Sequence, residues 1–178
     1  FVGRIAPNKA FQDIIAAAAL LRTKIPNVKV RFVGDTSFTS YYSYLTKLVS
    51  QLALEDVVTF TGRVTETQLA TEYLSAQVFC CLSDHEGFGV PILEAMKLGL
   101  PVIAYNAAAV PETLGNAGLL INNKSPIIVA TAIERVITDQ NLSKSMTAAG
   151  EQRAAKFSEN YTASKFFSAI NSMGDYEN

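Results

Sequence analysis

The chain has 178 residues, 49% of them hydrophobic, which is enough to bury the core of one domain. Its formal net charge is −1 and Lys and Arg form no run, which argues against a nucleic-acid-binding protein. The only histidine, His85, leaves too few imidazoles for a histidine metal cluster or a Ser-His-Asp triad.

The first predicted elements are a strand, a loop and a helix. Residues 1–3 are expected to end a buried strand, and residues 10–24 carry apolar side chains at helical spacing. Arg4 and Lys9 lie between them, in the kind of loop that usually binds phosphate in open α/β sheets. The two cations could neutralise a diphosphate, or both could be ordinary solvated charges.

Strands and helices continue to alternate along the chain. Further strands are predicted over residues 28–33, 57–60, 76–82, 100–104 and 118–121. Further helices are predicted over residues 40–52, 65–75, from 91, from 111, and over 126–138, 142–156 and 161–172. Such alternation predicts an α/β fold: a Rossmann-like parallel sheet of about six strands with helices on both faces.

Three local features of the middle of the chain are predicted to be structural. Thr65, with a Gln three residues later, forms a capping box. Cys80 and Cys81 are neighbours on a strand, so we expect small core residues on opposite faces, in a reducing compartment, rather than a metal pair. Tyr41 and Tyr44 belong to a helical stripe that is expected to pack in the core.

The strongest candidate site is a predicted loop that turns into a helix between residues 85 and 96. Glu86 lies on the loop, and Glu94, after seven intervening residues, lies about one turn into the helix. Gly87 and Gly89 allow positive φ and a close approach of the backbone to a ligand.

Backbone donors complete this candidate site. The N–H groups of Phe88, Gly89 and Val90 are predicted to point outward at the positive end of the helix dipole. Backbone donors beside two carboxylate acceptors suit a sugar joined to a phosphate. Taken by itself, the stretch could also be a tight turn with an acid placed favourably for the dipole.

Several of the candidate residues follow predicted strands. Arg4, Lys9, Gly34, Arg63 and Glu86 all do so, and parallel sheets bind ligands at the carboxyl ends of their strands. We therefore expect these residues along one edge of the sheet. The side chain of Arg63 could face either a ligand or solvent.

With these residues placed, the sequence resembles the C-terminal, donor-binding half of glycosyltransferase family 4, the group 1 glycosyltransferases of GT-B fold. The resemblance covers nearly the whole chain and is carried by residues 1–4 with Lys9, 33–35, 60–62, 83–89, 91–96, 99–104 and 111–113. Family members usually carry Gly where this chain has Ala10, and we expect little effect of that methyl group on phosphate approach.

The resemblance implies a role for each candidate residue. Arg4 and Lys9, next to Gly3, match the pair that holds the donor's diphosphate. Glu86 matches the first acid of the family's E-x7-E motif, which contacts hydroxyls of the donor sugar, and Glu94 matches the second, which accepts hydrogen bonds from the ribose.

The rest of the implied site is largely backbone. The N–H groups of Phe88, Gly89 and Val90 should face the sugar or the phosphates, and Arg63 and Val64 match the segment against the nucleotide base. No metal is expected, because the cations and the helix N-terminus would stabilise the leaving diphosphate.

The implied activity is that of a retaining hexosyltransferase, which moves a hexose from a nucleotide diphosphate sugar to a glycan or lipid-linked acceptor. The motif region resembles bacterial polysaccharide mannosyl- and glucosyltransferases, so GDP-mannose and then UDP-glucose are the expected donors. Positioning of the sugar is favoured for Glu86 over double displacement. The alternatives are a nucleotide-sugar-binding module without activity and another GT-B enzyme, an epimerase or a phosphorylase.

Residues 1–178 are thus predicted to form one donor-binding domain, with the N-terminal acceptor domain absent. The chain begins at Phe1 without an initiator Met, and we expect it to be a fragment with weak binding and little turnover. The location of the implied nucleotide-sugar donor, together with the lack of a signal peptide or an apolar run of transmembrane length, predicts a cytoplasmic protein. A lipid-linked acceptor would bring it to the inner face of the membrane.

Overall fold

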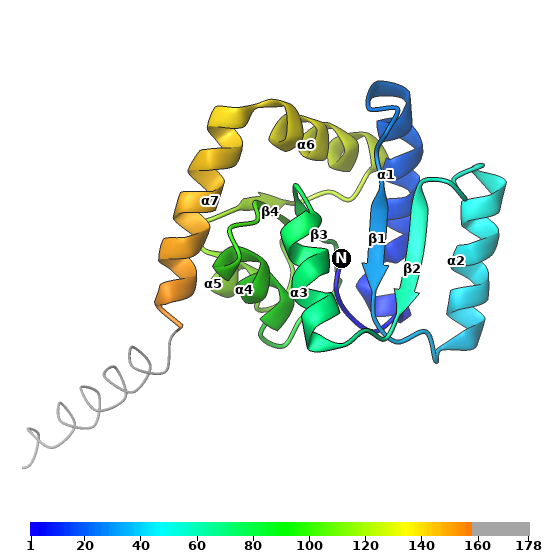
Figure 1. Cartoon of the computed structure of the whole chain (residues 1–178), viewed down its shortest axis with the longest axis horizontal. Coiled ribbons are helices and arrows are strands. Elements are labelled where there is room, and N and C mark those ends of the chain that lie inside the picture. Colours follow the sequence, from blue (N-terminus) through cyan, green and yellow to red (C-terminus); the bar gives the residue numbers. More distant parts are fainter. Residues whose placement is uncertain (158–178) are drawn as a thin grey trace, which may run out of the picture.

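The computed structural model describes residues 1–157, in which five strands alternate with helices (Figure 1). The strands are β1 (Val30–Val33), β2 (Val58–Gly62), β3 (Phe79–Cys81), β4 (Val102–Tyr105) and β5 (Leu119–Ile121). The helices are η1 (Pro7–Lys9), α1 (Phe11–Lys24), α2 (Thr39–Gln51), α3 (Glu66–Ser75), α4 (Val90–Lys97), α5 (Val110–Leu114), α6 (Pro126–Thr138) and α7 (Gln140–Ala155). The helix predicted over 161–172 lies outside the described residues.

All strand pairs are parallel, as the alternation of strands and helices predicted. β1 pairs with β2, and β3, β4 and β5 form a second sheet in that order. The N-terminal segment joins β1 through a single parallel bridge between Val2 and Val33. The six predicted strands are therefore five strands and one bridge, and Figure 1 shows the N-terminus between β1 and β3.

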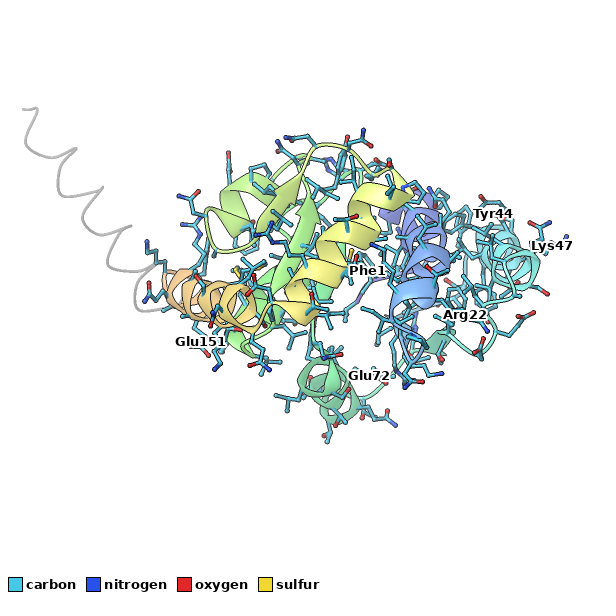
Figure 2. The ribbon with its side chains drawn as sticks, turned by 90° about the horizontal axis from the view of Figure 1, so that it is seen from above. Phe1, Arg22, Tyr44, Lys47, Glu72 and Glu151 are labelled. Atoms are coloured by element: carbon cyan, nitrogen blue, oxygen red, sulfur yellow. The ribbon has the colours of Figure 1, made fainter. Side chains whose placement is uncertain are left out.

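Helices cover the sheets on both faces. α1 packs against α6, and α4 packs against α7. Seen from above, α2 with Tyr44 and Lys47 lies at the opposite end of the molecule from α7 with Glu151, and α3 with Glu72 projects to one side (Figure 2). None of the helices described in residues 1–157 is long and apolar enough to cross a membrane.

Two hydrophobic clusters form the core: one joins β1 and β2 to one face of the β3–β5 sheet, and the other covers the opposite face of that sheet. The first surrounds Phe11 and Phe32, and the second surrounds Ile92 and Met96. The ring of Phe1 packs against both clusters and so connects them.

The two cysteines confirm the prediction of small core residues on opposite faces. Cys80 belongs to the first cluster and Cys81 to the second, and both are buried, free thiols. Burial raises the pKa of Cys80 to about 12, so this thiol stays protonated at neutral pH.

Two helix predictions have different outcomes. The capping box of α3 is confirmed, because the Thr65 side chain accepts from the Gln68 N–H and the Gln68 side chain accepts from the Thr65 N–H. On α2, Tyr41 is buried as predicted, but Tyr44 is half-exposed and stacks on the outer side of Tyr41. The helical stripe is wider than the core it meets, so its outermost ring faces solvent.

Candidate functional site

Loops that follow neighbouring strands meet at one edge of the fold. Ile5 N–H donates to the carbonyl of Asp35 at 2.8 Å, and Gly34 N–H donates to the carbonyl of Gly62 at 3.0 Å. Asp84 N–H donates to the carbonyl of Asn8 at 2.9 Å. These bonds tie the loops after the N-terminal segment, β1, β2 and β3 into one continuous rim.

An ion pair lies at the centre of this rim. Lys9 Nζ is 2.6 Å from Glu86 Oε1, although the two residues are 77 positions apart. Their side chains are only 19% and 12% exposed, respectively, so the pair is partly desolvated. Ser83 Oγ, fully buried, donates to the same oxygen at 2.6 Å. The two donors hold the Glu86 carboxylate in a defined orientation.

The backbone conformation at position 10, directly after Lys9, is one that glycine adopts more easily than alanine. Ala10 is the N-cap of α1 and adopts the left-handed conformation, with φ 53° and ψ 41°. Its N–H donates to the carbonyl of Pro7 at 3.1 Å and closes η1. Because a left-handed L-residue costs about 1–2 kcal/mol, the glycine usual in the resembled family relieves strain in the backbone.

The loop between β3 and α4 ends at Gly89, which has φ 75° and is the N-cap of α4. Gly89 uses the positive φ that a glycine allows, whereas Gly87 does not. Within residues 1–157, the N–H groups of Phe88, Gly89 and Val90 donate to no other protein group. They form an open set of donors at the N-terminus of α4.

α5 supports this loop from behind. Thr113 Oγ1 donates to the carbonyl of Phe88, and Ala109 N–H donates to the carbonyl of Glu86 at 3.4 Å. Arg153 Nε from α7 in turn donates to the carbonyl of Thr113 at 3.1 Å. The loop is therefore braced by two helices that come later in the sequence.

Sequence reasoning missed two residues that hold this region. Tyr73 from α3 donates to Glu94 Oε2 at 2.7 Å. Lys124, after β5, places Nζ 2.5 Å from Asp84 Oδ1 and 3.4 Å from Asp13 Oδ2. Neither residue belongs to a local motif, so no spacing in the sequence could have indicated these contacts.

The other two cations of the predicted site are more exposed than Lys9. Arg4 is exposed, and Arg63 is 82% exposed with its guanidinium 2.6 Å from Asp35 Oδ2. Val64, the next residue, is half-buried. Gly3 N–H donates to the carbonyl of Val33 at 2.8 Å. In residues 1–157, no group of three or more His, Cys, Asp or Glu side chains is arranged to hold a metal ion.

Replacing Arg63 by glutamine should raise the pKa of the Asp35 carboxyl toward its ordinary value of 3.8. The hydrogen bond from Arg63, and then that from Ser37 N–H, holds this pKa low. A lowered pKa means that Asp35 stabilises the fold above its ordinary pKa and that this contribution disappears as pH falls through the folded-state pKa. Titration of the Asp35 carboxyl carbon by NMR measures the change.

The control for this experiment is a second exposed arginine pair. Arg31 lowers the pKa of Glu72 by a hydrogen bond. The Arg31→Gln variant should therefore raise the pKa of Glu72 and leave that of Asp35 unchanged. An Asp35 pKa that is the same in wild type and in R63Q would contradict the assignment of the shift to Arg63.

Solved structures define the class of fold. HepE from Anabaena, crystallised in complex with UDP, is similar over 97% of this chain and 49% of its own, with a TM-score of 0.82 and 25% identity. The C-terminal domain of the group 1 glycosyltransferase LpcC from Francisella tularensis is similar over 88% of this chain and 83% of its own, with a TM-score of 0.77 and 28% identity. The class is that of the GT-B glycosyltransferases.

Sequence comparison identifies the family. The family model described as Glycosyl transferases group 1 matches residues 1–153, and the chain belongs to that family. A GDP-mannose-dependent alpha-(1-6)-phosphatidylinositol monomannoside mannosyltransferase from Mycobacterium tuberculosis is 31% identical over 160 residues, which are 85% of this chain and 41% of the relative. The chain spans less than half the length of the curated relatives it matches.

Proposed function

We propose that this chain is the donor-binding half of a retaining glycosyltransferase. It would transfer a hexose from a nucleotide diphosphate sugar to a glycan or lipid-linked acceptor held by an N-terminal domain. The observation that carries the proposal is the 2.6 Å pair of Lys9 and Glu86 beside the open N-terminus of α4. A cation, an acid and free backbone donors are the groups that a sugar diphosphate requires.

The roles proposed for the cations are electrostatic. Lys9 and Arg4 bind the diphosphate, whose negative charge grows as the glycosidic bond loosens. Stabilisation that increases toward the transition state raises the rate, and the N–H groups at the start of α4 add to it. With this charge met by the protein, we expect no metal requirement.

Glu86 is proposed to position the sugar. Its Oε1 atom is occupied by Lys9 and Ser83, which leaves Oε2 to accept from a sugar hydroxyl. An acid neutralised by a lysine is a weak nucleophile, so this geometry favours positioning over double displacement. Glu94 would accept from the ribose, and Arg63 and Val64 would lie against the base.

The similar proteins suggest two candidate donors. The mycobacterial relative is named as GDP-mannose-dependent, and HepE was crystallised with UDP. GDP-mannose is the first proposed donor because the matched relatives include mannosyltransferases, and UDP-glucose is the second.

Calorimetric titration with GDP, UDP and ADP tests the proposal. We expect the folded chain to bind at least one of them, and the Glu94→Gln variant to bind it more weakly. A folded chain that is indifferent to all three would overturn the proposal. For the whole enzyme, release of nucleoside diphosphate together with a product of retained anomeric configuration would separate transfer from epimerase and phosphorylase activity.

A further inference from the structure

Tyr73 is the only buried residue of α3, and it is directed at Glu94. Its side chain is 3% exposed, and its hydroxyl lies 2.7 Å from Glu94 Oε2 and 3.4 Å from the carbonyl of Pro91. The ring packs against Phe79 of β3, with 5.8 Å between the ring centroids. The hydroxyl is therefore fixed by packing before any ligand arrives.

The direction of this hydrogen bond is settled by chemistry. Burial raises the pKa of the Tyr73 phenol, and the neighbouring Glu94 carboxylate raises it further. The phenol keeps its proton at every physiological pH, so it is a permanent donor to the carboxylate. One oxygen of Glu94 is thereby held, and the rotation of the carboxylate group is restricted.

We propose that Tyr73 is a positioning residue, which holds Glu94 Oε2 so that the other carboxylate oxygen accepts from the ribose hydroxyls of the nucleotide. This inference rests on the proposed function, in which Glu94 binds the ribose. It also gives α3 a part in the site, because its one buried side chain connects it to the first turns of α4. A carboxylate held in advance loses less rotational freedom on binding, which strengthens the contact.

The test compares a nucleoside diphosphate with its 2′,3′-dideoxy analogue in wild type and in the Tyr73→Phe variant. The variant removes one oxygen and keeps the ring against Phe79. We expect it to weaken binding of the ordinary nucleotide by about tenfold, the usual effect of losing a hydrogen bond to a charged group. The dideoxy analogue has no hydroxyl for Glu94, so its affinity should change by less than about twofold.

The control is Tyr44→Phe, which removes a hydroxyl from a half-exposed ring on α2 and should alter neither affinity. Equal losses for both nucleotides in Y73F would mean a general structural role and would overturn the inference, as would no loss for either.

A wild-type protein that binds neither nucleotide would overturn the proposed function instead. Crystal structures of wild type and Y73F would then test whether Tyr73 holds the Glu94 carboxylate in place. A displaced Glu94 carboxylate in the variant supports the positioning role, and an unmoved one refutes it.

Discussion

Replacing Lys9 by methionine should weaken binding of nucleoside diphosphates at least tenfold, as expected for loss of a charge-assisted hydrogen bond of about 1.5–3 kcal/mol. It should also lower the free energy of unfolding by about 3 kcal/mol, because removing one partner of a poorly solvated pair leaves an uncompensated charge. Only 12% of the Glu86 side chain reaches solvent, so water cannot replace the ammonium fully. Calorimetry and urea unfolding measure the two effects.

Two controls separate charge from packing. In the double variant K9M/E86Q both charges are absent, so most of the stability should return while the affinity stays low. The exposed pair of Lys24 and Glu134 provides a matched comparison, and Lys24→Met should change stability by less than about 0.5 kcal/mol. If K9M is as stable as wild type, the pair is not the desolvated contact that we describe.

The second large effect is expected for Gly34→Ala, which should lower the free energy of unfolding by about 3 kcal/mol or prevent folding. Gly34 has φ 146°, and a Cβ there would lie 2.1 Å from the carbonyl oxygen of Gly3. The atoms that this Cβ would meet, the carbonyl group of Gly3 and the amide nitrogen of Arg4, belong to the backbone, so they cannot rotate away as a side chain could. Thermal or urea unfolding would measure the loss.

Gly87 provides the matched control for that substitution. A Cβ at Gly87 meets nothing within 4 Å, and its φ is not positive. Gly87→Ala should therefore change the free energy of unfolding by less than about 0.5 kcal/mol. Comparable losses in both variants would show that the close approach of Gly34 to Gly3 is not what limits substitution.

Much of the fold could be predicted because its signals are local. The helix over 126–138 matches α6 residue for residue, since Pro126 starts it and its apolar spacing continues to the end. The capping box at Thr65 could be predicted for the same reason, because its two residues are only three positions apart. The first predicted strand is only a bridge at Val2, because one residue pair satisfies the hydrogen-bond pattern there.

The site was predictable to the level of loops. Residues after strands could be assigned to one edge from topology alone, but which side chains touch could not. Tyr73 and Glu94 are 21 positions apart, and Lys124 and Asp84 are 40 apart, and both contacts depend on packing between whole elements. The sequence does not predict the direct pairing of Lys9 with Glu86 either, because the family resemblance implies a separate ligand contact for each. Their roles toward a donor stay predictions.

The pairing of Lys9 with Glu86 has a kinetic consequence. An ammonium already neutralised by a carboxylate projects little field into solvent, whereas the exposed guanidinium of Arg4 does. Long-range attraction of an anionic nucleotide would then fall mainly to Arg4, and short-range retention to Lys9. Added salt would accordingly slow the encounter more than it hastens departure, because mobile ions screen exposed charges far better than enclosed ones.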